Sequence, residues 1–132
     1  MTRAVLPELL KGGGGSIINI STVASLVGIR GLSAYAASKG GLDSLTRSIA
    51  VDYAQDNIRC NVMNPGLVDT PMAAPLMADP ASLEPIMAQY AIRRPGKPEE
   101  VAKMVLYLAS DDAMWVTGAT FPIDGGMTIS KG

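Results

Sequence analysis

The sequence contains no histidine and only one cysteine, Cys60. The missing histidine excludes Ser-His-Asp and Cys-His mechanisms and removes the commonest ligand of transition metals, so we expect no metal site. A single cysteine cannot form an internal disulfide, which is typical of a reducing, cytoplasmic compartment. Any acid–base chemistry must therefore come from a tyrosine, a lysine, a carboxylate or a hydroxyl.

The chain also has little net charge and no long apolar run. Its 11 basic and 12 acidic residues leave a net charge of −1, which gives no electrostatic reason to expect a nucleic-acid partner. No apolar run approaches the length of a membrane span, and Pro7 and Glu8 interrupt the start before a signal-peptide core could form. With 48% apolar residues over 132 positions, we expect one globular domain, 1–132.

Apolar periodicity, proline and glycine divide the chain into alternating helices and strands. The stretch GGGG at 12–15 follows a predicted helix and precedes a predicted strand, so it is interpreted as a turn and not as a phosphate-binding loop. The predicted elements are a helix at 2–11, a strand at 16–22, a helix from a Ser33 cap to about 54, a strand at 57–63, short broken helices in the proline-rich segment 71–95, a helix from Pro98, and a strand containing Pro122, which indicates a sheet edge.

This alternation predicts an α/β fold with a three-stranded parallel sheet flanked by helices. Ligands of such sheets bind beyond the carboxyl ends of the strands. Thr22, the Pro65-Gly66 pair and Thr70 all follow the carboxyl ends of predicted strands. We therefore expect a ligand site at that edge, with the segment 71–95 as a candidate lid.

The stretch SAYAASKGG places Tyr35 and Lys39 four residues apart among small side chains. On a helix this spacing puts both on one face, one turn apart. One interpretation is a surface helix whose tyrosine packs and whose lysine is solvated. The other is a phenol whose deprotonated form is favoured by the neighbouring ammonium, which is useful for acid–base chemistry.

Four stretches, in this order and spacing, resemble the C-terminal half of the short-chain dehydrogenase/reductase family. They are GSIINISTVASLVG, YAASKGGL, IRCNVMNPGLVDTPM and RPGKPEEVAKMVLYLASDDAMWVTGATFPIDGG, which together cover nearly the whole chain. The resemblance implies a truncated Rossmann-like fold and an oxidoreductase that uses NAD or NADP on carbonyl or alcohol substrates.

By this resemblance, Tyr35 is the proton donor to a carbonyl oxygen, or the base in the reverse reaction. Lys39 assists the phenol and holds the nicotinamide ribose. The family has a serine thirteen residues before this tyrosine, where this sequence has Thr22, which keeps the hydroxyl but adds a methyl group. The cofactor-binding residues implied by the family are Tyr35, Lys39, Pro65, Gly66, Val68 and Thr70.

The sequence departs from the family pattern in what it does not contain. Nothing resembles the Gly-rich turn that binds the pyrophosphate, and no asparagine matches the family's catalytic one. The strand at 16–22 also lacks its family neighbour, which would leave an apolar edge free to pair. We therefore expect homo-oligomerisation through this edge, through the helix at 33–54, or through both.

Three functions remain open at this stage. The first is the short-chain oxidoreductase, completed by an oligomer or by a second polypeptide that supplies the nucleotide-binding half. The second is a cofactor-independent hydrolase that uses the cluster Thr22-Tyr35-Lys39. The third is an inactive half-domain that acts as an oligomerising scaffold. The substrate and the choice between NAD and NADP cannot be read from these residues.

Overall fold

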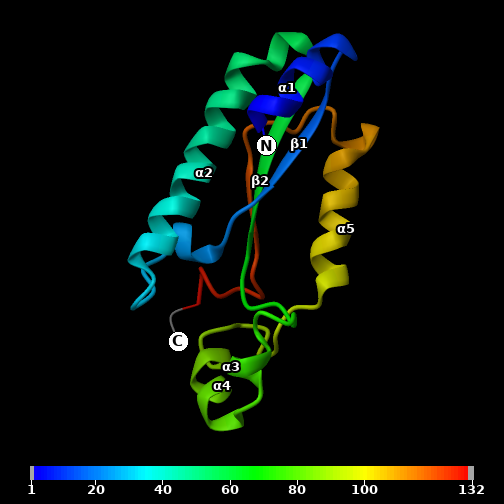
Figure 1. Cartoon of the computed structure of the whole chain (residues 1–132). Helices are drawn as coiled ribbons and strands as arrows, with labels where there is room; N and C mark the ends of the chain where they lie inside the picture. The colour runs from blue at the N-terminus through cyan, green and yellow to red at the C-terminus, as the bar shows by residue number, and fades with distance from the viewer. Residues whose placement is uncertain (1, 131–132) are drawn as a thin grey trace.

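The computed structural model describes residues 2–130 (Figure 1). Within this range it contains one three-stranded sheet, in which both strand pairs are parallel and the strand order is β1-β2-β3. The helices and strands are α1 (Thr2–Lys11), β1 (Gly15–Ile20), α2 (Ser33–Asp52), β2 (Ile58–Pro65), α3 (Ala74–Met77), α4 (Pro80–Met87), α5 (Pro98–Ala109) and β3 (Thr120–Ile123). The predicted fold class is confirmed.

Helices α2 and α5 cover opposite faces of the sheet (Figure 1). Because side chains alternate along a strand, each strand contributes to both layers. Ile17 of β1 and Cys60 of β2 pack with Ile49 on the α2 side. Met63 of β2 faces the other way and packs with Leu108 of α5. Two apolar layers therefore fix the sheet between the two helices.

The predicted boundaries need two corrections near the start of α2. Strand β1 ends at Ile20, two residues before the predicted end, because the chain turns into a short 3-10 helix at Val23–Ser25. Ser33 does not cap α2: it is the first helical residue, and the preceding Leu32 occupies the N-cap without a side-chain hydrogen bond. The helix starts there because the Leu32 carbonyl already accepts from the amide of Ala36 at 2.7 Å.

The turn predicted from the run of glycines and the sheet edge predicted from Pro122 both agree with the structure. Residues 12–14 form a turn between α1 and β1, Gly15 begins β1, and Gly14 adopts a positive φ of 135°. A side chain at Gly14 would lie 2.6 Å from the carbonyl oxygen of Asn57, so the turn requires glycine. Pro122 lies in β3, which forms an edge of the sheet.

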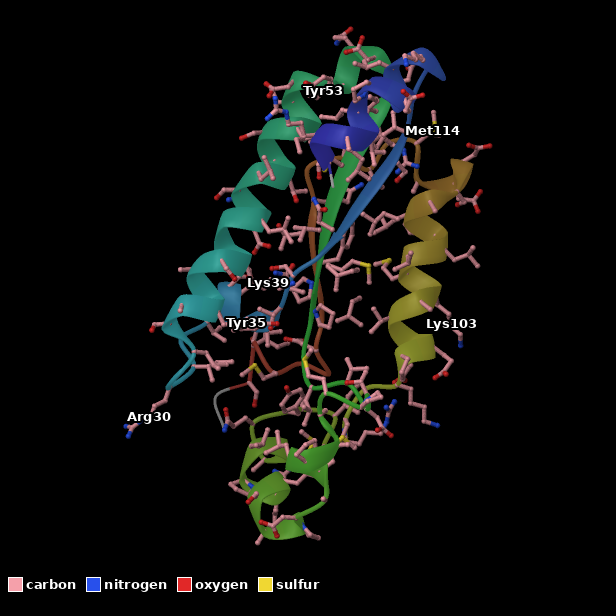
Figure 2. The ribbon with its side chains drawn as sticks, viewed as in Figure 1. Arg30, Tyr35, Lys39, Tyr53, Lys103 and Met114 are labelled. Carbon is pink, nitrogen blue, oxygen red and sulfur yellow. The ribbon has the colours of Figure 1, made fainter. Side chains whose placement is uncertain are left out.

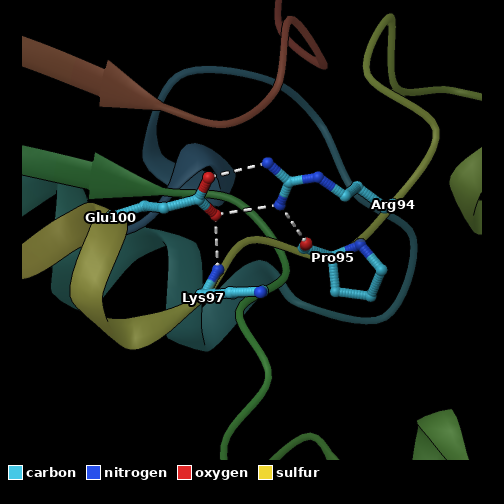
Figure 3. Close-up of polar contacts among 4 residues, drawn as sticks. All are labelled: Arg94, Pro95, Lys97 and Glu100. Atoms are coloured by element: carbon cyan, nitrogen blue, oxygen red, sulfur yellow. Dashed lines mark hydrogen bonds and ion pairs between the residues drawn. The ribbon is translucent and has the colours of Figure 1, made fainter.

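The proline-rich segment 71–95 forms the short helices α3 and α4, beyond the carboxyl ends of the strands (Figure 1). It leads into α5, whose start is fixed by Glu100 (Figure 3). The Glu100 carboxylate pairs with the Arg94 guanidinium, with a shortest distance of 2.7 Å, and accepts from the Lys97 amide at 2.7 Å. The hydrogen bond from Arg94, followed by that from the Lys97 amide, lowers the pKa of Glu100 to about 2.

None of the helices between residues 2 and 130 combines the length and the apolar character that crossing a membrane would require.

Candidate active site

Helix α2 presents Tyr35 and Lys39 toward the carboxyl end of β1 (Figure 2). The ammonium nitrogen of Lys39 lies 6.0 Å from the centroid of the Tyr35 ring. The same nitrogen donates to the carbonyl oxygen of Ile20 at 2.8 Å, which ties α2 to the last residue of β1. The two side chains are therefore neighbours at the edge where the sequence predicted a site.

The polar groups of this pair remain available to a ligand. The Tyr35 side chain is 44% exposed, and within residues 2–130 its hydroxyl makes no hydrogen bond. Lys39 uses one N–H on Ile20, which leaves two further donors on its ammonium group. A ligand oxygen beside Tyr35 would thus meet an uncommitted phenol with a cation close behind it.

Thr22 follows β1 and caps the 3-10 helix Val23–Ser25. Its Oγ1 accepts from the amide of Ala24 at 3.3 Å, and its hydroxyl proton has no acceptor in the part of the chain that the structure describes. The neighbouring Ser21 is buried, and its Oγ donates to the carbonyl oxygen of Lys39 at 3.3 Å. Of the two hydroxyls, that of Thr22 is the one with a proton left to donate.

A cavity of about 610 Å³ opens at the carboxyl ends of the strands. It brings together six of the seven predicted site residues, whereas Lys39 lies behind Tyr35 and does not line it. Segment 71–95 contributes Met72, Ala73 and Leu76 to its apolar wall. The predicted residues that line it are Thr22, Tyr35, Pro65, Gly66, Val68 and Thr70.

Tyr90 fixes the loop after β2, and sequence reasoning missed it. Its phenol oxygen accepts from the amide of Leu67 at 2.8 Å, and burial raises the pKa of Tyr90. A Cβ at Gly66 would lie 2.9 Å from the Tyr90 ring, so glycine is required where the loop passes this ring. No local pattern marks Tyr90, because it meets Gly66 only through the folding of segment 71–95.

A buried polar cluster behind Thr22 was also missed. It consists of Ser25, Asp43 and Asn64, and the amide of Asn64 donates to the carbonyl oxygen of Thr22 at 3.1 Å. One signal was visible in the sequence, since Asp43 follows Lys39 by one helical turn and must share its face of the helix. Within residues 2–130, no group of three or more metal-ligating side chains is placed to hold a metal ion.

This geometry defines the chemistry open to the site. Two hydroxyls, on Thr22 and Tyr35, border one cavity, and each has a proton that it can donate to a ligand bound there. A parallel sheet with helices on both faces and a cavity at its carboxyl edge is half of a Rossmann-like α/β fold.

The chain belongs to the short-chain dehydrogenase/reductase family. A family model described as enoyl-(acyl carrier protein) reductase matches residues 1–128. The chain is 44% identical to the 2-(R)-hydroxypropyl-CoM dehydrogenase of Xanthobacter autotrophicus over 126 residues, which cover 96% of this chain and 50% of that protein. The relatives are dehydrogenases and reductases, as the resemblance implied.

Solved structures agree with this assignment. A short-chain type dehydrogenase/reductase from Mycobacterium ulcerans superposes with a TM-score of 0.95 at 30% identity, over 99% of this chain and 48% of that one. An NAD(P)-dependent gluconate 5-dehydrogenase from Beutenbergia cavernae, which has NADP bound, superposes with a TM-score of 0.93 at 35% identity, over 98% and 52%. The chain thus spans about half the length of the relatives it matches.

Proposed function

We propose that this chain forms the catalytic half of an oxidoreductase that interconverts a carbonyl and an alcohol with NAD(H) or NADP(H). The observation that carries the proposal is the placement of the Thr22 and Tyr35 hydroxyls on one cavity, with the Lys39 ammonium 6.0 Å from the tyrosine ring. Membership of a family of dehydrogenases and reductases supports the same reaction class.

In this proposal Tyr35 gives its proton to the carbonyl oxygen of the substrate and takes it back in the reverse direction. The Lys39 ammonium lies 6.0 Å from the centroid of the tyrosine ring, where its positive charge is close to the oxygens between which the proton moves. The Thr22 hydroxyl donates a second hydrogen bond to the same oxygen and so orients the carbonyl. A nicotinamide held beside these residues would supply the hydride to the carbonyl carbon, or would accept it from the alcohol.

The residues present fit the nicotinamide end of such a cofactor. The cavity has the size of a small-molecule site, and Pro65, Gly66, Val68 and Thr70 form one wall of it. The two uncommitted donors of Lys39 suit the ribose hydroxyls. Within residues 2–130, no tight Gly-rich turn leads directly from a strand into a helix, so in this proposal the pyrophosphate is held by a nucleotide-binding half that a second polypeptide or a rearranged oligomer supplies.

Two further parts of the proposal concern the segment 71–95 and the edge of β1. Met72 and Leu76 line the cavity from segment 71–95, which supports its role as a substrate lid.

Within the described residues β1 pairs only with β2, so its other edge is open to a strand of the nucleotide-binding half or of a second copy. The exposed Leu45 and Val51 on α2 support an additional contact through that helix.

Titration with NADH and NADPH tests this proposal. Nicotinamide fluorescence is expected to change on binding to this chain, alone or combined with a nucleotide-binding half. The Tyr35→Phe variant should lose about 10²–10⁴-fold in turnover, the usual contribution of a positioned proton donor, and should change the affinity for the dinucleotide by a much smaller factor. The matched control is Tyr107→Phe, which removes the hydroxyl of an exposed tyrosine on α5, outside the cavity lining, and should change neither quantity.

The other two functions give different results in the same experiment. Hydrolysis of an activated ester that Tyr35→Phe abolishes, without dinucleotide binding, would favour the hydrolase. If neither NADH nor NADPH binds at millimolar concentration, and no hydrolysis occurs, the isolated chain is a scaffold and the oxidoreductase proposal fails for it.

A further inference from the structure

The cluster of the half-buried Ser25 with the buried Asp43 and Asn64, here called the Asp43 cluster, lies between Thr22, α2 and β2. Its members come from three segments: the turn after β1, the middle of α2 and the end of β2. Asp43 is 4% exposed and Asn64 is fully buried. Burying an aspartate is costly, and the reaction proposed above does not use it. We propose that Asp43 is a positioning residue that holds the Thr22 hydroxyl in place relative to Tyr35 and Lys39.

Hydrogen bonds connect Asp43 to its two partners. Asp43 Oδ2 lies 2.6 Å from Ser25 Oγ and accepts from the Asn64 amide nitrogen at 3.1 Å. The single hydroxyl proton of Ser25 lies within hydrogen-bond distance of both Asp43 Oδ2 and the Thr22 carbonyl oxygen. The same Asn64 nitrogen lies 2.8 Å from Ser25 Oγ, so its two N–H groups are shared among Asp43 Oδ2, Ser25 Oγ and the Thr22 carbonyl oxygen. One carboxylate oxygen thus holds both side chains against the middle of α2.

The same two side chains determine where the Thr22 backbone lies. The Thr22 carbonyl oxygen is 2.7 Å from Ser25 Oγ and 3.1 Å from the Asn64 amide nitrogen. It also accepts from the backbone amide of Ser25 at 3.1 Å. Since this carbonyl and the Thr22 hydroxyl belong to one residue, fixing the carbonyl limits where the hydroxyl can point into the cavity.

A second set of bonds ties the same turn to Lys39. Asp43 lies one helical turn beyond Lys39 on α2, and the Lys39 ammonium donates to the carbonyl oxygen of Ile20 at 2.8 Å. Ser21 Oγ donates to the Lys39 carbonyl oxygen at 3.3 Å. Ile20 and Ser21, the two residues before Thr22, are therefore anchored to the helix that carries Tyr35 and Lys39.

Asp43 acts here through geometry and not through its charge. Within residues 2–130 its carboxylate forms no ion pair, and the two side-chain acceptors Asp43 Oδ1 and Asn64 Oδ1 are buried without a hydrogen-bond partner. The cluster therefore has more acceptors than donors. An asparagine at position 43 would keep one acceptor for Ser25 and Asn64, and its amide would bring two N–H donors to a site that lacks them.

This inference rests on the proposed function only in treating Thr22 as the residue that contacts the substrate oxygen. Its test needs no turnover. Amide hydrogen exchange can be followed at Ala24, which donates to Thr22 Oγ1, and at Val62 in the central strand as a reference. The matched control is Asp52→Ala, which removes an exposed aspartate from the same helix.

Asp43→Ala should raise the exchange rate of Ala24 about tenfold more than that of Val62, as expected when about one hydrogen bond's worth of local stability is lost. Asp43→Asn should restore the Ala24 rate to within about twofold of the original, and Asp52→Ala should not change it. Ser25→Ala, which removes the hydroxyl that lies between Asp43 Oδ2 and the Thr22 carbonyl oxygen, should repeat the local effect of Asp43→Ala and serves if Asp43→Ala does not fold.

Three results would overturn the inference. The first is an Ala24 rate that rises no more than the Val62 rate, which would make Asp43 a general stabilising residue. The second is an Asp43→Asn variant that behaves like Asp43→Ala, which would assign the effect to charge. The third is an unchanged Ala24 rate in folded Asp43→Ala. If the unmodified chain does not bind NADH or NADPH, the result instead counts against the proposed function and leaves the role of Asp43 in positioning Thr22 to the exchange rates.

Discussion

The two neighbouring strands β1 and β2 differ sharply in burial. Every residue from Ile58 to Asn64 of β2 is buried, whereas no residue of β1, Gly15–Ile20, is. Strand β2 has a strand on each side and a helix layer on each face, but β1 has a strand on one side only. The difference shows that the core is complete around β2 and incomplete around β1, where a further strand would finish the sheet.

The largest expected effect comes from truncating a core side chain in each strand. Met63→Ala in β2 should lower the free energy of unfolding by about 2–5 kcal/mol, because it opens a cavity against Leu108. Ile18→Ala in β1, on the same face, should cost about 1–2 kcal/mol, because Ile18 is only partly buried. Urea denaturation measures both. Equal costs would mean that β1 is covered in solution by a partner.

A charge beside the free edge tests whether β1 pairs with a second copy. Ile20 ends β1 and is 44% exposed, so Ile20→Lys should change the free energy of unfolding by no more than about 0.5 kcal/mol. It should nevertheless shift the chain toward monomer in sedimentation, because lysine on an edge strand opposes pairing. The control is Leu106→Lys on α5, where the side chain is 73% exposed. A wild-type chain that is already monomeric at micromolar concentration would contradict the proposed assembly.

A substitution in α2 distinguishes the helix from the strand edge as the contact. A Cβ at Gly41 would meet no atom within 4 Å among the described residues, so the structure gives no sign of the close backbone approach that a glycine pair often marks. Gly41→Ala should therefore stabilise α2 by about 1 kcal/mol in thermal unfolding. If a second copy packs against this face, the same variant would instead weaken the oligomer.

The smallest effect concerns α5, the helix that covers both strands on one face. Because its folded-state pKa is lowered to about 2 from 4.5, Glu100 contributes stability above its unfolded-state pKa, and this contribution is lost as pH falls toward the lower value. Glu100→Gln should reduce the acid dependence of the free energy of unfolding in that window. The effect should be small and sensitive to salt, since the pair with Arg94 is exposed. If the Glu100→Gln variant has the same acid dependence as the original chain, the stabilising contribution assigned to the Glu100 carboxylate is contradicted.

The parts of the fold that the sequence predicted depend on short-range patterns. The register of Tyr35 and Lys39 follows from helical periodicity, and the edge position of β3 follows from the missing N–H of Pro122. The wrong prediction that Ser33 is the N-cap also came from a short-range pattern. Serine is a good capping residue, but the chain path out of the preceding loop puts Leu32 at that position.

The missed residues depend on contacts between distant segments. Ser25 and Asn64 are 39 residues apart in the chain, and Ser25 and Asp43 are 18 apart, yet they form one cluster. No periodicity places the turn after β1 beside the end of β2, since only the parallel register of the two strands does so. Tyr90 is a similar case, because its contact with Leu67 depends on how the broken helices fold back.

Of the two outer strands of this sheet, only β1 has an edge that suits pairing with a further strand. The carbonyl oxygens of Ala119, just before β3, and of Ile123, at its end, accept from the amides of Val62 in β2 and of Gly66 just after it. The alternate position Pro122 therefore turns its nitrogen outward, where it offers no donor to an incoming strand. An open filament requires two complementary interfaces on each subunit. A subunit with only one edge that can pair binds a single further copy, and two copies joined through this edge would form a symmetric dimer and not a fibre.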